Sequence, residues 1–295
     1  MSNIFVLGSG SRLFKSVSEQ LNFRFKNIER PYFGNVKKYI ENNQDYSDRV
    51  FVLNFAAPTA DSFHFTKSYT GVMDIDRALD LIATKYSNVT IIHIASFAEF
   101  QQGISILDCQ RKIFKPLRRN INFELVIDQP YAFWKIWQHN KIVSLSSRLN
   151  VTVIEFNIPF IDFSDISANK NYYMPNGNAI FPPKDKFDVV RSITLADSIN
   201  SIVKHANQKE LYKEVFCSEG KSSIYGLCGI TLSENNSCQL SKKTLSFVML
   251  IISYIVKSPR ISRIFDKFLV MGGLDKSLSE SVELIKQDEN MDKRV

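Results

Sequence analysis

The sequence has little of what marks several classes of protein. Glycine (11) and proline (9) are sparse among 295 residues, which excludes a collagen-like or low-complexity chain. The hydrophobic share of 44% excludes a disordered chain. The formal charge of +7 includes no long block of lysine and arginine, and no nucleic-acid motif is present, so no nucleic-acid partner is expected. That charge either attracts an anionic ligand such as a nucleotide or belongs to a solvated surface.

Cysteine is equally scarce. None of the cysteines lies in a Cys-x-x-Cys pair and no histidine stands at metal-ligand spacing beside them, so we expect free thiols and no metal site. The start of the chain has no basic region and too short an apolar run for a signal peptide, which predicts a reducing, cytoplasmic location. The four are Cys109, Cys217, Cys228 and Cys238.

Long hydrophobic runs are also missing. The longest candidate, 245–256, falls short of the ~20 apolar residues that a spanning helix needs. Two interpretations stay open for this region. It forms a packed helix, or 245–268 contacts a membrane surface, because Arg260, Arg263 and Lys267 follow on an amphipathic stretch.

Short apolar runs alternate with stretches of helical periodicity. Buried strands are expected at 3–7, 50–55, 89–95 and 151–156, and helices at 12–21, 71–86 and 131–149. Apolar strands separated by helices predict an α/β fold, a Rossmann-type doubly wound parallel sheet covered on both faces. Ligands of such sheets bind at the carboxyl ends of the strands, so the residues just after each strand are the candidates for function.

The first candidate is the turn after the first strand, in the segment VLGSGSRLF. Small residues let the backbone approach a pyrophosphate, and the next helix offers N–H groups at its start. The glycine pattern is incomplete, because Leu13 stands at the third position, and an ordinary strand-to-helix turn is the alternative. The residues predicted to bind a dinucleotide here are Gly8, Gly10, Ser11, Arg12 and Leu13.

Three further candidates follow later strands. Ala56 and Ala57 leave room for a ribose or a flat ring, and Ser96 places a hydroxyl in the crevice. Tyr131 and Lys135 are four residues apart and so share one helical face. An ammonium near a phenol lowers the phenol's pKa from ~10, which makes the tyrosine a candidate general acid and base.

The order of these motifs resembles that of the extended short-chain dehydrogenase/reductases, the NAD-dependent epimerase/dehydratase group. The later segments 151–159, 188–198 and 214–220 are similar to the corresponding family segments, and the resemblance covers roughly residues 3–275. It implies NAD or NADP as cofactor and a catalytic trio of Ser96, Tyr131 and Lys135. Tyr131 would exchange a proton with a sugar oxygen, Ser96 would hydrogen-bond that oxygen, and Lys135 would also hold the nicotinamide ribose.

The sequence departs from the family pattern in several places. Ser11 and Phe14 replace two glycines of the turn. Glu29 would suit the ribose of NAD, whereas Arg30, a predicted cofactor residue, would suit the phosphate of NADP. Phe97 and Ala98 follow Ser96 where the dehydratases carry Asp-Glu, which argues against dehydration.

The resemblance implies a division into an NAD(P)-binding domain (1–157), a smaller substrate lobe (158–285, with segments returning to the main domain) and a charged tail (286–295). The leading hypothesis is a sugar-nucleotide epimerase of surface-polysaccharide biosynthesis, which would bind a nucleotide sugar. The alternatives are an NADPH-dependent keto-sugar reductase and a non-catalytic dinucleotide-binding regulator. Members of the family that the sequence resembles also often form homodimers through helices that include the one carrying Tyr131 and Lys135.

Overall fold

The computed structural model describes residues 3–28, 33–42, 49–57, 65–96, 99, 130–162, 186–205 and 211–223. The strands are β1 (Asn3–Leu7), β2 (Lys26–Ile28), β3 (Arg49–Asn54), β4 (Asn88–Ser96), β5 (Val151–Ile158), β6 (Phe160–Asp162), β7 (Lys186–Arg191), β8 (Tyr212–Phe216) and β9 (Gly220–Ser223). The helices are α1 (Arg12–Ser18), α2 (Phe33–Asn42), α3 (Phe65–Lys85), α6 (Pro130–Ser146) and α7 (Ser192–Lys204).

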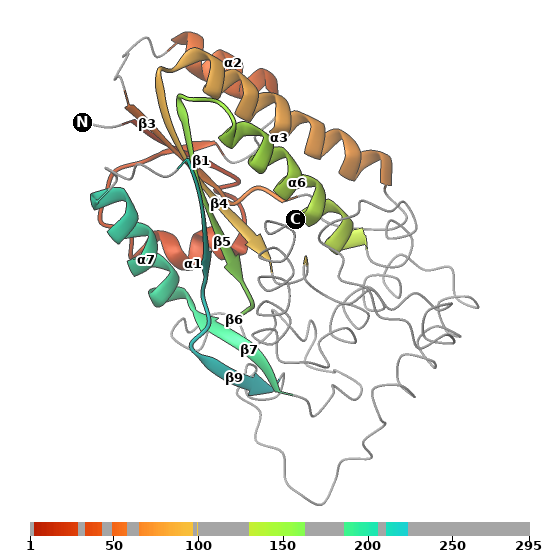
Figure 1. Cartoon of the computed structure of the whole chain (residues 1–295), viewed down its shortest axis with the longest axis vertical. Helices are drawn as coiled ribbons and strands as arrows, with labels where there is room; N and C mark the ends of the chain where they lie inside the picture. The colour runs from red at the N-terminus through yellow and green to blue at the C-terminus, as the bar shows by residue number, and fades with distance from the viewer. Residues whose placement is uncertain are drawn as a thin grey trace, which may run out of the picture.

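Six strands form a parallel sheet in the order β2-β1-β3-β4-β5-β8 (Figure 1). The chain runs outward from β1 to β2 and then returns to the other side of β1 as β3. The direction of winding therefore reverses between β1 and β3, which is the place where doubly wound sheets bind their ligands. The predicted Rossmann-type α/β class is confirmed.

Helices cover both faces of the sheet, as its continuous apolar strands require (Figure 1). On one face α2, α3 and α6 pack on residues such as Val52, Ile91 and Val153. On the other face α1 and α7 pack on the alternate residues of the same strands, such as Leu53 and Ile92. Successive side chains along β3, β4 and β5 therefore point alternately toward the α2/α3/α6 layer and toward the α1/α7 layer.

A second sheet of three strands, in the order β6-β7-β9, continues from the end of β5. Its link to the main sheet is apolar, because Ile161 and Val190 join the core cluster of the α1/α7 face. It lies at the start of the predicted substrate lobe. The boundaries at residues 157 and 285 remain a prediction.

Each of the predicted strands and helices is present. β1 has the predicted bounds, and the others have shifted ends, most clearly α3, which begins at Phe65 rather than at residue 71. The helices in these ranges are too short or too polar to cross a membrane. The predictions for 245–268, for Arg30 and for Cys109, Cys228 and Cys238 lie outside the described residues. Cys217 is a buried free thiol, and burial raises its pKa to about 11.

Candidate functional site

The glycine turn meets β3 at the switch point of the sheet. Gly8 has a φ of +81°, a conformation that favours glycine, and a Cβ there would lie 2.6 Å from the backbone nitrogen of Ala56. The Phe55 N–H donates to the carbonyl of Leu7 over 2.9 Å, which holds the two strand ends together. The ends of β1 and β3 therefore pack so closely that the positions of Gly8 and Ala56 need glycine or a small residue.

The start of α1 differs from the sequence-based expectation. The N–H of Phe14 donates to Ser11 Oγ over 3.1 Å, so the N-cap serine takes up a group that was expected to meet a phosphate. The Phe14 ring is buried and packs edge-on against Phe25 and Phe55. The phenylalanine that replaces a family glycine thus fills a cavity in the core beside α1.

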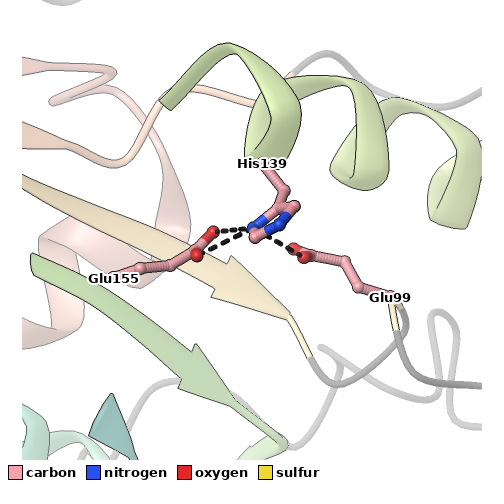
Figure 2. A group of neighbouring side chains, drawn as sticks. All are labelled: Glu99, His139 and Glu155. Atoms are coloured by element: carbon pink, nitrogen blue, oxygen red, sulfur yellow. Dashed lines mark hydrogen bonds and ion pairs between the residues drawn. The ribbon is translucent and has the colours of Figure 1, made fainter. Parts of the chain in front are cut away.

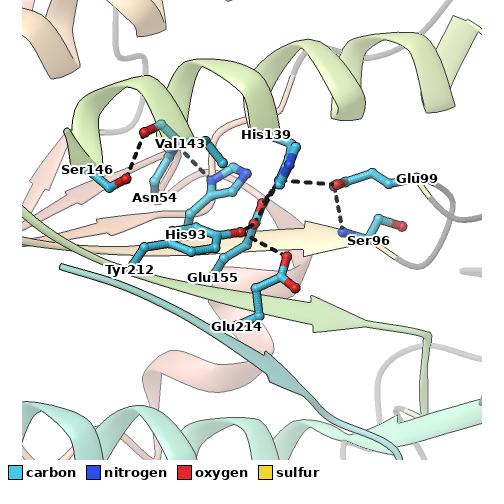
Figure 3. A network of polar contacts seen from close by, with 10 residues as sticks. All are labelled: Asn54, His93, Ser96, Glu99, His139, Val143, Ser146, Glu155, Tyr212 and Glu214. Carbon is cyan, nitrogen blue, oxygen red and sulfur yellow. Dashed lines mark hydrogen bonds and ion pairs between the residues drawn. The ribbon is translucent and has the colours of Figure 1, made fainter. Parts of the chain in front are cut away.

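A row of polar side chains crosses the α3/α6 face of the sheet where the apolar pattern ends. Asn54, His93, Glu155 and Glu214 stand opposite one another on β3, β4, β5 and β8 (Figure 3). Residues opposed in parallel strands point to the same face, so all four side chains lie on the side that α6 covers. Each of the strands has apolar residues before this position, and a polar row at one level marks a built site.

His93 is fully buried at the centre of this row. Asn54 Oδ1 accepts the Ala56 N–H over 3.2 Å, so its Nδ2 faces His93 Nδ1 at 3.1 Å and donates to it. Burial, followed by the nearby Lys135 charge, lowers the pKa of His93 to about 3, and the ring is neutral. Its Nε2 has no hydrogen-bond partner among the described residues, so only one of the two ring nitrogens of this buried histidine is hydrogen-bonded there.

Lys135 projects from α6 toward the end of β4. Its side chain is 5% exposed, and its Nζ donates to the carbonyl of Ile94 over 2.9 Å, two residues before Ser96. Burial lowers the pKa of Lys135, and the charges of Glu99 and Glu155 oppose that shift. The helix and strand therefore bring the predicted lysine next to the strand end that carries the predicted serine.

Glu99 and Glu155 meet at His139, one helical turn beyond Lys135 on α6 (Figure 2). His139 Nδ1 lies 2.8 Å from Glu155 Oε2 and 3.9 Å from Glu99 Oε2, and both carboxylates are fully buried. The three ligand atoms lie within 4.8 Å of one another, close enough to hold a metal ion. Instead, the distance between His139 and Glu155 is that of a hydrogen bond, and the charges of both carboxylates act on Lys135, whose pKa they raise against the effect of burial.

Glu99 also reaches back to the end of β4. Its Oε1 accepts the backbone N–H of Ser96 over 3.2 Å. At the other end of the cluster the Tyr212 hydroxyl lies between Glu155 and Glu214 and shares its one proton between them, and its pKa is raised by burial and by these two carboxylates. Residues from β4, β5, β8 and α6 thus form one continuous polar network (Figure 3).

Asn157 lies two residues beyond Glu155 and on the same face of β5. It is fully buried, and neither its Oδ1 nor its Nδ2 has a hydrogen-bond partner in the described part of the chain. A buried amide without partners is costly and rare, so its presence at the carboxyl end of a strand indicates a ligand contact. Gln138 on α6 donates to the carbonyl of Ala56 over 2.9 Å, which ties the switch point to the same helix.

The predicted site residues fall into three groups. Gly8, Ala56, Ser96 and Lys135 lie at the carboxyl edge of the sheet or against it. The other described cofactor candidates lie around the start of α1 or after β3: Gly10, Ser11, Arg12 and Leu13 in the turn and first helical residues, and Ala57, which is exposed. Tyr131 is the second residue of α6, and its side chain lies outside the described residues.

Sequence reasoning missed Glu99, Glu155 and Asn157 as site residues. Their signal was present: polar residues interrupt apolar strands at one register, and Glu99 comes three residues after Ser96. His139, which belongs to no motif in the sequence, joins the two buried carboxylates.

No family model matches the sequence, and no curated protein matches it either. Among solved structures, the chain is similar to dTDP-4-dehydrorhamnose reductase from Bacillus anthracis in complex with NADP, at 13% identity and a TM-score of 0.51 over 82% of this chain and 85% of that one. It is similar to the Bordetella bronchiseptica enzyme WbmH in complex with NAD+, at 13% identity and 0.51 over 78% and 79%. A GDP-6-OMe-4-keto-L-xylo-heptose reductase from C. jejuni matches at 11% identity and 0.50 over 77% and 81%. These likenesses confirm the fold that the resemblance to extended short-chain dehydrogenase/reductases implied.

Proposed function

We propose that the protein is an NAD(P)-dependent epimerase of a nucleotide sugar in surface-polysaccharide biosynthesis. The observation that carries the proposal is the approach of Lys135 to the end of β4, where its ammonium donates to Ile94 two residues before Ser96. In this arrangement a hydroxyl, an ammonium and the helix that bears Tyr131 converge at the carboxyl edge of a Rossmann-type sheet. Solved structures of similar fold contain NADP or NAD.

The closely packed ends of β1 and β3 at the switch point support the proposal of a dinucleotide site there. A Cβ at Gly8 would overlap the Ala56 backbone, so the closeness of these strands depends on a residue without a side chain. Gly8 and Ala56 would lie under the pyrophosphate and ribose, and Lys135 would bind the nicotinamide ribose. When bound, NAD(P) supplies hydride acceptance and return at a sugar carbon.

The remaining chemistry belongs to residues of this chain. Tyr131 would take a proton from a sugar hydroxyl as the hydride leaves and return it when the keto group is reduced. Ser96 would donate a hydrogen bond to the same oxygen and stabilise the charge that develops there. The Lys135 charge would favour the phenolate of Tyr131. The amide of Asn157 would provide a polar contact for the substrate.

A mass spectrum of small molecules released from the purified, denatured protein tests this proposal. An epimerase regenerates its cofactor, so we expect a retained dinucleotide and turnover without added NADPH. Tyr131→Phe removes only the hydroxyl and should lower kcat at least a hundredfold. Full biological activity in Tyr131→Phe would contradict catalysis and favour a non-catalytic dinucleotide-binding protein.

A keto-sugar reductase is the second candidate, and two of the solved structures of similar fold are reductases of keto sugars. A reductase releases oxidised cofactor at every turnover. Consumption of NADPH in proportion to product, with no dinucleotide retained on purification, would assign the protein to this class.

A further inference from the structure

Lys135 is a lysine whose amino group is almost completely removed from water. Its side chain is 5% exposed, and its Nζ donates to the neutral carbonyl of Ile94. Burial disfavours the charged form of an amine, so a lysine in this position tends to lose its proton. The function proposed above needs the ammonium, because only the cation binds strongly to a ribose and stabilises a phenolate.

Two carboxylates near Lys135 oppose the loss of that proton. Glu99 and Glu155 come from different parts of the chain, are fully buried, and both lie against His139, one helical turn beyond Lys135 on α6. Their negative charges favour the charged form of the lysine. Each is also held in place. Glu99 accepts the Ser96 N–H at 3.2 Å, and Glu155 accepts from His139 at 2.8 Å.

We propose that Glu99 is a positioning residue, whose buried carboxylate acts with that of Glu155 to keep Lys135 a cation and to fix the end of β4 at Ser96. One side chain thereby controls both the charge of the lysine and the place of the serine. The proposal rests on the proposed function for its catalytic consequence, but the effect on Lys135 is a property of the protein without any ligand.

The surroundings of Lys135 are consistent with this role. From β4, His93 is neutral and adds no positive charge. From β8, the Tyr212 hydroxyl lies within hydrogen-bond distance of both Glu155 and Glu214 and shares its single proton between them. Other titratable groups on α6 or facing it in the described chain include His139 on α6 itself, Asp76 of α3, which accepts from Trp137, Tyr69 of α3, which contacts the Trp137 ring, and the Lys141–Asp80 pair. The side chain of Tyr131 lies outside the described residues.

NMR of the protein labelled with 13C at the lysine ε-carbons tests the charge effect directly, with Lys135→Met used to assign the Lys135 signal. Glu99→Gln keeps an oxygen that accepts the Ser96 N–H and removes only the charge. We expect the titration midpoint of Lys135 to fall by about one pH unit or more, because a unit charge a few ångströms away contributes up to about three pH units at an effective dielectric near 20. Glu41→Gln, in an exposed pair with Lys37 outside this network, is the control and should leave the midpoint unchanged.

Activity measurements test the positioning effect. In Glu99→Gln the alkaline limit of kcat/KM should move to lower pH together with the Lys135 midpoint. Glu99→Ala also removes the acceptor of the Ser96 N–H, so it should lower kcat further at a pH where Lys135 is still charged. Equal kcat in the two variants at that pH would overturn the positioning role.

A stability comparison keeps the proposal testable if Glu99→Gln folds poorly. Lys135→Met leaves the buried carboxylates without their cation, and adding Glu99→Gln removes one of them. The double variant should therefore unfold at a higher urea concentration than Lys135→Met alone.

Other outcomes separate this proposal from the proposed function. An unchanged Lys135 midpoint in Glu99→Gln overturns the inference, even in an active enzyme. A lowered midpoint in a protein that binds no dinucleotide supports the charge effect and rejects the function. One equivalent of divalent metal in the purified protein, lost in Glu99→Gln, overturns the inference, because the carboxylates would then serve the metal.

Discussion

At the scale of single residues, the site is built from groups that a stable core would exclude. Gly8 adopts a backbone conformation that other residues avoid, and Asn157 buries an amide whose two polar atoms have no partner in the described chain. Both features cost stability in the free protein. Both lie at the carboxyl edge of the sheet, where sheets of this class bind their ligands, so we attribute the cost to ligand binding. Substitutions can test this explanation.

Gly8→Ala should destabilise the protein by roughly 2–4 kcal/mol, because the methyl group meets the Ala56 backbone and the positive φ is strained. Urea unfolding followed by circular dichroism measures this change. Gly71→Ala is the control: nothing lies within 4 Å of its Cβ, and alanine in α3 should stabilise by up to about 1 kcal/mol. Equal effects of the two substitutions would contradict the close packing at Gly8.

Asn157→Leu should leave the stability of the free protein unchanged or raise it by about 1 kcal/mol, because it removes two unsatisfied polar atoms. Asn54→Leu is the matched comparison in the neighbouring row. Its amide bonds to His93 and Ala56, so its loss should cost about 1–3 kcal/mol. Urea unfolding midpoints of the two variants, measured in the same buffer, test this difference. A loss of stability in Asn157→Leu as large as that in Asn54→Leu would show that the Asn157 amide is hydrogen-bonded in the free protein.

At the scale of elements, one carboxylate joins the second sheet to the start of α7. Glu219, between β8 and β9, accepts the backbone N–H of Arg191 over 2.6 Å and a hydrogen bond from Thr194 Oγ1. The Arg191 guanidinium also pairs with it at 3.0 Å. These contacts, led by the hydrogen bonds from Arg191, lower the pKa of Glu219 to about 2.

The depressed pKa predicts a pH dependence of stability. Because the folded protein binds this proton less readily than the unfolded chain, the contribution of Glu219 is present above about pH 4.5 and is lost as pH falls toward 2. Glu219→Gln should therefore lower the urea midpoint at pH 7 and have a smaller effect at pH 3. Glu41→Gln, in an exposed pair with Lys37, should have little effect at either pH. A constant deficit for Glu219→Gln at both values would contradict the assignment.

At the scale of the whole molecule, the two faces of the main sheet differ in the side chains that they carry near its carboxyl edge. Its α1/α7 face continues as an apolar core through Leu53, Ile92 and Ile154, whereas its α3/α6 face ends in the polar row beneath α6. The switch point between β1 and β3 lies at the same edge, and Gln138 connects it to α6. Ligand binding at this edge should therefore stabilise the fold as a unit.

A bound dinucleotide is expected to raise the melting temperature. At a free concentration one hundred times Kd, binding to the folded state alone contributes about 2.7 kcal/mol, which corresponds to several degrees in Tm. Thermal unfolding with NAD+ or NADP+ measures the rise and identifies the preferred cofactor. Gly8→Ala should show a smaller rise at the same concentration, and Gly71→Ala the full rise. No rise with either dinucleotide would argue against the cofactor.

Much of the fold could be predicted from the sequence, because apolar runs and helical periodicity act over a few residues. The runs at 50–55 and 89–95 became β3 and β4 with ends shifted by a residue. The start of α3 was missed because the periodicity used to find it begins only at Val72. The site was predicted in part: Ser96 and Lys135 follow a recognisable order, whereas Glu99 and Glu155 carry no motif.

The sequence by itself determined the alternation of strands and helices, the glycine turn and the helical spacing of Tyr131 and Lys135, since these depend on neighbours along the chain. Only the tertiary structure decided that Glu99 and Glu155 meet at His139, because that meeting depends on the register of β4 against β5 and on how α6 lies across them. Charges distant in sequence influence one another strongly only when folding removes the water between them.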